Sequence, residues 1–214
     1  MTWRDVASLL RERGWNTIVP DLAGVIERGP PYHDSIARNV ASSLPPAERL
    51  ILVGHSFAGA LLPAIAAASA ANVAAEVFVD ALLPSPGKSW FKTVPLDFAA
   101  QLRALAVGDR LPPWHEWFPP DAVASILPDE ALRERFVAEI QGLPLAFFEE
   151  PLPSVEDRAP AHAYLLLSAP YTPLADDAES RGWPTVRESA DHLAMLTRPR
   201  LVADRLAELL EALP

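Results

Sequence analysis

Hydrophobic positions along the chain follow two periods, one typical of amphipathic helices and one typical of short buried strands. Val6, Leu9 and Leu10 share one helical face of residues 3–13, with arginine and glutamate on the other face. Further helices are predicted at 34–43, 57–71, 175–181 and 199–213. Short strands are predicted at 15–20, 50–53, 76–81, 163–167 and 185–188. Because strands and helices alternate, we expect an α/β fold with a doubly wound, mostly parallel sheet.

One long segment, residues 84–160, interrupts this alternation. It holds much of the proline and three of the six tryptophans, Trp90, Trp114 and Trp117. A linker would not carry so many large apolar residues. We therefore predict one core built from residues 1–83 and 161–214, with residues 84–160 inserted as a helical lid.

Composition and charge narrow the classes of function. Half of the 214 residues are hydrophobic, which is enough for one sizeable core. The net charge of −10 argues against nucleic acid and anionic membranes as partners, since both need a basic face. The absence of cysteine excludes disulfides and thiolate metal sites. No secretory signal and no apolar run of roughly 18 to 20 residues is found. We expect a soluble cytoplasmic protein that acts on a small molecule, as a monomer or a homodimer.

The stretch GHSFAG, residues 54–59, places Ser56 directly after the apolar strand at 50–53 and before an apolar helix. A sharp turn between strand and helix lifts such a serine out at the carboxyl edge of the sheet, where it can act as a nucleophile. The turn needs small neighbours, here Gly54 and Ala58, followed by Gly59. The main-chain N–H of Phe57 is then the expected first oxyanion donor. The alternative is that Ser56 is only a small residue at a tight turn.

A nucleophilic serine needs a base, and His192 is the candidate. It stands in SADHLAML, after the last short strand and ahead of the closing helix. In the chain order serine, acid, histidine, that is the position of the base. The alternative is an isolated surface histidine.

At this point the sequence resembles the α/β-hydrolase superfamily, in particular its small esterase-like members, which are related to hydroxynitrile lyases and plant methylesterases. The segments that carry the resemblance are LILVGHSFAGALLPAIA, VFVDALLP, GWP and DHLAML. The resemblance implies a Ser–acid–His triad, an oxyanion hole and a lid over the substrate pocket. It implies no metal and no organic cofactor.

The acid departs from the family pattern. The usual aspartate would fall on or near Thr172, which carries no charge. Asp176 lies a few residues later, where we expect the start of a helix and where acidic residues are ordinarily capping or solvated. Asp80 ends the strand VFVD, and a carboxylate there is costly to bury unpaired. We expect Asp80 to be the better substitute, with a structural role at the start of the lid as the alternative.

The N-terminus departs as well. Family members usually begin with an apolar strand and a loop that supplies the second oxyanion donor, and neither is seen before residue 3. The sheet is therefore expected to lack its first strand or strands. A late start site, a truncated chain and a naturally shortened relative are three accounts that the sequence leaves open.

Aromatic residues in the lid segment, Trp90, Trp114 and Trp117 among them, are candidates for binding an apolar substrate, or else they fill the lid's own core. The leading hypothesis is a serine hydrolase for a small, largely apolar ester. A hydroxynitrile-lyase-like lyase stays open, with Lys88 or Lys92 as its pocket charge. So does a binding protein without catalysis.

Overall fold

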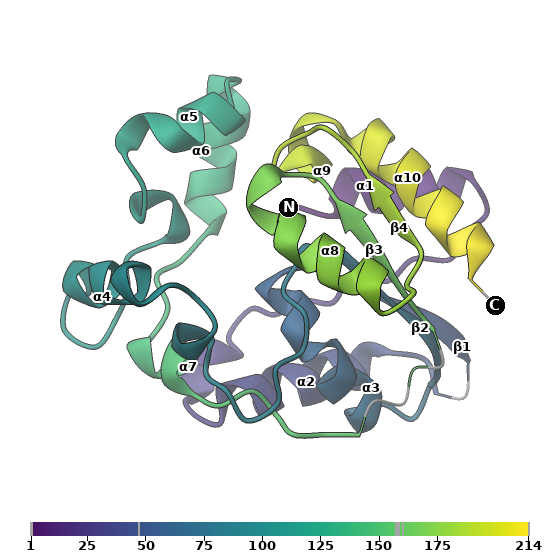
Figure 1. Ribbon diagram of the computed structural model, residues 1–214, viewed down its shortest axis with the longest axis horizontal. Helices are drawn as coiled ribbons and strands as arrows, with labels where there is room; N and C mark the ends of the chain where they lie inside the picture. The colour runs from purple at the N-terminus through teal and green to yellow at the C-terminus, as the bar shows by residue number, and fades with distance from the viewer. Residues whose placement is uncertain (1, 47, 157–158, 160, 214) are drawn as a thin grey trace.

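The protein is described here by a computed structural model that covers residues 2–46, 48–156, 159 and 161–213. Within these residues the chain forms a four-stranded sheet (Figure 1). All three pairs of neighbouring strands are parallel, and their order in space follows the chain. The strands are β1 (Arg49–Ser56), β2 (Asn72–Ala81), β3 (His162–Leu166) and β4 (Thr185–Arg187). The predicted parallel α/β fold is confirmed.

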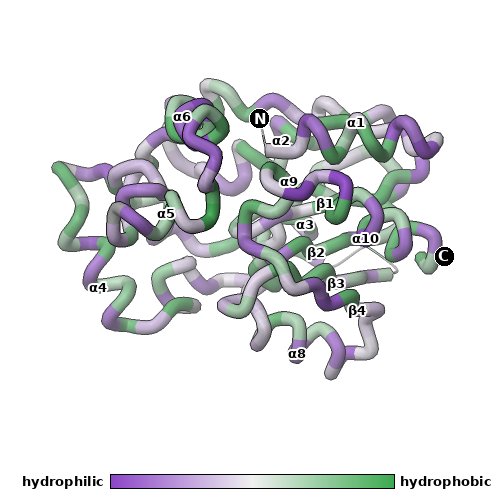
Figure 2. Tube along the Cα trace, turned by 90° about the horizontal axis from the view of Figure 1, so that it is seen from above, coloured by the Kyte–Doolittle hydropathy of each residue, from purple (hydrophilic) through white to green (hydrophobic). Residues whose placement is uncertain are grey.

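Helices cover both faces of the sheet, as a doubly wound fold requires. One face packs against α1 (Arg4–Glu12), α9 (Ala194–Thr197) and α10 (Pro199–Ala212). The other face packs against α2 (Tyr32–Ser43), α3 (Leu62–Ala68) and α8 (Thr172–Ser180). In Figure 2 the apolar strands run between α1 on one side and α8 on the other.

The central strand β2 shows why both layers are needed. Val77 and Val79 belong to the cluster with α1 and α10, whereas Phe78 belongs to the cluster with α2, α3 and α8. Successive side chains of a strand point to opposite faces, so a continuous apolar run requires cover on both. Every residue of β2 from Val73 to Ala81 is buried, and two of them, Glu76 and Asp80, are carboxylates.

The predicted strand at 15–20 is not formed. These residues follow α1 as an extended loop, and both Ile18 and Val19 are exposed. A strand needs a neighbour for its hydrogen bonds, and the described residues supply none beside this segment. The strand that carries Ser56, β1, is therefore the edge of the sheet in the described part of the chain. This agrees with the expectation of a missing first strand.

The described residues of the segment 84–160 connect β2 to β3 and form short helices. They are η3 (Trp90–Lys92), α4 (Leu96–Leu105), η4 (Trp114–Glu116), α5 (Pro120–Ile126), α6 (Glu130–Glu139) and α7 (Leu145–Glu149). Figure 1 shows α4, α5 and α6 standing to one side of the sheet. The role of this segment as a lid stays a prediction, and we keep the name lid segment for it.

Two short 3-10 helices lie beside the sheet. One, η2 (Phe57–Leu61), follows β1 directly, and the other, η5 (Ala169–Tyr171), follows β3. A third, η1 (Ile26–Arg28), lies in the loop before α2. Among the described residues, no helix has the length and apolar character to cross a membrane.

Candidate active site

Ser56 occupies a strained turn between β1 and η2. Its backbone has φ 56° and ψ −128°, a region that non-glycine residues rarely adopt. Such strain costs on the order of 1–3 kcal/mol and is concentrated at functional sites. The turn thus places the half-buried Ser56 at the carboxyl end of β1, the position predicted for it.

Close backbone approach explains the glycines around this turn. A Cβ atom on Gly59 would lie 2.5 Å from the carbonyl oxygen of Leu82, and one on Gly54 would lie 3.0 Å from the amide nitrogen of Gly59. Gly59 is therefore the position at which a side chain does not fit. The sequence analysis required a small residue at the neighbouring position, Ala58, which is exposed.

His192 lies between Ser56 and Asp80. Its Nε2 is 3.2 Å from the Ser56 Oγ, and its Nδ1 is 2.7 Å from a carboxylate oxygen of Asp80. The imidazole is in the loop between β4 and α9. Asp191 stabilises this loop, because its carboxylate accepts hydrogen bonds from the Leu193 N–H and the Thr197 hydroxyl.

Asp80 is a fully buried carboxylate at the end of β2. Its Oδ1 accepts hydrogen bonds of 2.9 Å from the main-chain N–H groups of Leu167 and Ser168, and its Oδ2 accepts one from the Ser168 hydroxyl. Burial alone would raise the pKa of Asp80, but the hydrogen bonds from His192, Ser168 and Leu167 outweigh it and lower the pKa. The carboxylate thus stays ionised beside the imidazole. Its φ of 44° adds a second strained position at this edge.

The other candidate acid, Asp176, is not part of this group. It lies in α8 with an exposed carboxylate 2.6 Å from the Arg187 guanidinium. On that surface it pairs with arginine, and the Nδ1 of His192 is already bound to Asp80. The structure therefore brings Asp80, and not Asp176, to the imidazole.

Tyr171 is a site residue that the sequence analysis missed. Its hydroxyl is 3.2 Å from the Ser56 Oγ, and its ring stacks on the His192 imidazole with centroids 4.8 Å apart and planes at 8°. It directly precedes Thr172, the position at which the family's aspartate was sought. Only a carboxylate was expected near this position, and a tyrosine hydroxyl gives no comparable signal in the sequence.

Phe57 extends the turn toward the lid segment. Its ring centroid lies 5.0 Å from that of Phe147 in α7 and 5.4 Å from that of the buried His33. Phe57 is thereby fixed between the core and the lid segment. The role of its N–H as an oxyanion donor stays a prediction.

The three tryptophans proposed to bind substrate lie in two different places. Trp114 has its ring centroid 6.1 Å from that of His192. Trp90 and Trp117 are 9% and 8% exposed and pack against Phe148 in an aromatic cluster. Of the three, the structure thus brings only Trp114 next to His192, while the other two rings help to build the core of the lid segment.

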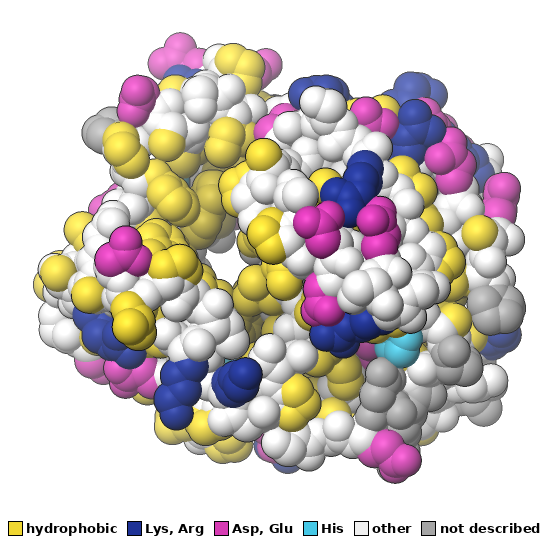
Figure 3. All heavy atoms as spheres, in the orientation of Figure 1, with side chains coloured by type: hydrophobic (Ala, Val, Ile, Leu, Met, Phe, Trp, Pro, Cys, Tyr) yellow, Lys and Arg dark blue, Asp and Glu magenta, His cyan; other side chains and the backbone are white. Residues whose placement is uncertain are grey.

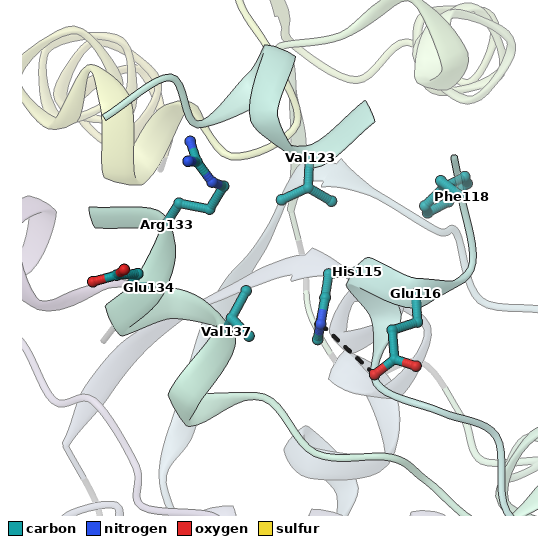
Figure 4. A pocket seen from close by; sticks show the side chains of 7 residues that line it. All are labelled: His115, Glu116, Phe118, Val123, Arg133, Glu134 and Val137. Atoms are coloured by element: carbon teal, nitrogen blue, oxygen red, sulfur yellow. Dashed lines mark ion pairs between the residues drawn. The ribbon is translucent and has the colours of Figure 1, made fainter. Parts of the chain in front are cut away.

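Two hollows involve the lid segment. Figure 3 shows one between the lid segment and the core, surrounded by hydrophobic side chains. A separate cavity of about 460 Å³ lies inside the lid segment (Figure 4). It is lined by His115, Glu116, Phe118, Val123, Arg133, Glu134 and Val137. The second cavity contains none of the residues around Ser56.

The model of the alpha/beta hydrolase family matches residues 1–205, so the chain belongs to the α/β-hydrolase family. The predicted resemblance is confirmed.

One curated relative is a carbendazim hydrolyzing esterase from Nocardioides sp. (strain SG-4G), 27% identical over 113 residues. The match covers 50% of this chain and 47% of that protein, so the chain spans about half of its length.

Among solved structures, an extracellular alpha/beta-hydrolase from a Paenibacillus species has a TM-score of 0.73 at 20% identity, covering 97% of this chain and 93% of that one. A pyrethroid hydrolase from Sphingobium faniae JZ-2 has a TM-score of 0.65 at 20% identity, with 99% and 92% covered. At these identities the likeness shows the fold.

Proposed function

We propose that this protein is a serine hydrolase for a small, largely apolar ester. Ser56 is the nucleophile, His192 the base and Asp80 the acid that orients it. The observation that carries the proposal is the continuous chain of contacts from Ser56 through both nitrogens of His192 to the buried Asp80 carboxylate.

Each residue has a defined part in this reaction. The Nδ1–H of His192 donates to Asp80, which leaves Nε2 free to take the Ser56 proton. The Ser56 oxygen then attacks the ester carbon, and the carbonyl electron pair moves onto oxygen, beside the N–H of Phe57. When the tetrahedral intermediate collapses, the C–O bond to the alcohol breaks and His192 returns the proton to that alcohol. Water repeats the two steps and releases the acid.

The substrate class rests on the surroundings of His192. Trp114 lies next to the imidazole, and the hollow between core and lid segment is surrounded by hydrophobic side chains (Figure 3). Apolar walls with few polar groups favour an uncharged, largely apolar ligand. The esterase and pyrethroid hydrolase among the similar proteins support an ester.

The two other functions considered from the sequence have less support. A lyase of the type considered would want a positive charge in the pocket, and both Lys88 and Lys92 are exposed. A binding protein has no need to keep Asp80 buried and hydrogen-bonded to His192.

The test is the intact mass of the purified chain after treatment with a fluorophosphonate probe. We expect one adduct on the wild-type protein, no adduct on Ser56→Ala and slow or no labelling of His192→Ala. Hydrolysis of p-nitrophenyl acetate and butyrate is then measured on the same three proteins. A folded wild-type protein that takes up no probe would overturn the proposal.

A further inference from the structure

We propose that Tyr171 is a catalytic residue whose hydroxyl donates a hydrogen bond to the oxyanion of the tetrahedral intermediate. This inference rests on the proposed hydrolase function and deepens it. It supplies an oxyanion donor in addition to the main-chain N–H of Phe57.

The first step concerns the hydrogen bonds of Ser56. Its hydroxyl has one proton and two lone pairs, and it has two neighbours, the Nε2 of His192 and the hydroxyl of Tyr171, each 3.2 Å away. The Nε2 of a neutral His192 whose Nδ1–H points at Asp80 is an acceptor, so Ser56 donates to it. Tyr171 is then the donor to the Ser56 oxygen.

The second step concerns the proton on Tyr171. Burial raises the pKa of Tyr171 to about 12, although the hydrogen bond with Ser56 acts in the opposite direction. The phenol therefore keeps its proton at neutral pH and remains an O–H donor. A donor with no negative charge of its own is suited to an oxyanion.

The third step concerns reach. The ester carbonyl oxygen is two bonds from the Ser56 oxygen once the C–O bond has formed. A hydroxyl 3.2 Å from the Ser56 Oγ therefore lies close to where the new negative charge develops. As Ser56 gives its proton to His192 and its lone pair to the ester carbon, the Tyr171 O–H turns from the Ser56 oxygen to the oxyanion. No proton leaves Tyr171 in this step.

The fourth step concerns how Tyr171 is held. It ends η5, and its N–H donates to the Ser168 carbonyl. Ser168 in turn donates through its N–H and hydroxyl to Asp80. The stack on His192 fixes the ring from the other side. The donor is thus pre-positioned by the same carboxylate that orients the base, and needs little reorganisation during the reaction.

The experiment compares Tyr171→Phe with the wild-type protein and with Tyr32→Phe. Phenylalanine keeps the ring stacked on His192 and removes only the hydroxyl. Tyr32→Phe removes the same atom from a buried tyrosine of α2 that packs on Phe147. Steady-state hydrolysis of p-nitrophenyl butyrate gives kcat and KM, and inhibition by a trifluoromethyl ketone, which forms a tetrahedral adduct with serine, reports binding of the charged intermediate. Thermal unfolding is recorded for all three proteins.

We expect Tyr171→Phe to lower kcat by about 100- to 1,000-fold with little change in KM, as for loss of one oxyanion donor. The affinity for the ketone should fall in parallel with kcat/KM. A tyrosine with only a structural role would not produce this parallel loss. Tyr32→Phe should keep its kcat. The inference fails if folded Tyr171→Phe retains more than half of the wild-type kcat and ketone affinity.

The failure of the proposed function is distinguishable from this result. In that case the wild-type protein itself neither hydrolyses esters nor takes up the fluorophosphonate. If the wild-type protein takes up the probe but hydrolyses no ester of the panel, the rate of labelling replaces kcat, with the same expected loss in Tyr171→Phe.

Discussion

The imidazoles of His55 and His192 lie side by side, with centroids 4.4 Å apart and planes at 38°. The Nε2 of His55 is 2.9 Å from the main-chain carbonyl oxygen of His192 and donates to it. Burial, together with the neighbouring His192, lowers the pKa of His55 to about 3. His55 therefore supports the His192 loop as a neutral ring, and would not oppose a positive charge on His192 in the proposed reaction.

The pKa of His55 predicts how stability depends on pH. Below its ordinary pKa of 6.5, the unfolded chain binds a proton at His55 that the folded chain excludes until about pH 3. The free energy of unfolding should then fall as pH is lowered from 6.5, by up to about 1.4 kcal/mol per pH unit from this group. His55→Gln, which keeps a side-chain N–H donor, should lose that part of the slope in urea denaturation between pH 7 and 4.5. His115→Gln in the lid segment is the control, and equal slopes for wild type and His55→Gln would contradict the prediction.

The position of Asp80 predicts which carboxylate supports catalysis. Asp80→Asn removes the charge beside the Nδ1 of His192 and should lower kcat by about 1,000- to 10,000-fold. Asp176→Asn removes an exposed carboxylate paired with Arg187 and should leave kcat within about twofold, since exposed ion pairs contribute little. Ester hydrolysis by the two variants measures this. Loss of activity in Asp176→Asn with retention in Asp80→Asn would reverse the assignment.

The close approach at Gly59 predicts a stability effect. In Gly59→Ala the new Cβ would meet the Leu82 carbonyl oxygen at 2.5 Å, so the turn has to shift. We expect a loss of about 1–3 kcal/mol in the free energy of unfolding, the usual cost of overpacking, with reduced labelling of Ser56. Ala58→Ser, at the exposed neighbouring position, should stay within about 0.5 kcal/mol of wild type. Chemical denaturation of both variants gives their free energies of unfolding. An equal loss in Gly59→Ala and Ala58→Ser would contradict the prediction.

The two environments of the lid tryptophans predict two kinds of effect. Trp114→Ala, next to His192, should raise KM for p-nitrophenyl butyrate by about tenfold through lost apolar contact. Trp117→Ala, inside the aromatic cluster, should instead lower the free energy of unfolding by about 3–5 kcal/mol. Kinetics and thermal unfolding of both variants separate the effects. A normal KM in Trp114→Ala would remove this residue from the substrate site.

The sequence predicted the features that depend on short segments. The apolar runs of β1 to β4 lie within a few residues of the predicted strands. For β2 and β3 the reason is that a strand buried on both faces leaves a continuous hydrophobic signal. Ser56 and His192 were selected because a nucleophile turn and its base have fixed places in the chain order. Asp80 was preferred to Asp176 because an acid that ends an apolar strand is costly to bury without a partner.

The remaining features depend on contacts between segments that are distant in the chain. Tyr171 meets Ser56 across 115 positions, and only the register of the strands brings their ends together. The expected strand at 15–20 had the right composition, but strand formation also requires a neighbouring strand. The sequence around Trp90 and Trp117 does not show whether these rings pack inside the lid segment or face a substrate.

In the described part of the chain, β1 lies at the edge of the sheet and ends in Ser56. One side of β1 is paired with β2, and Val53 in the same strand is exposed. An edge strand presents main-chain donors and acceptors to any strand that approaches it. A strand that paired there would touch β1, the element that ends in Ser56, on the side opposite β2. A strand that paired with β4, at the opposite edge, would be separated from β1 and Ser56 by three strand pairings, β4–β3, β3–β2 and β2–β1.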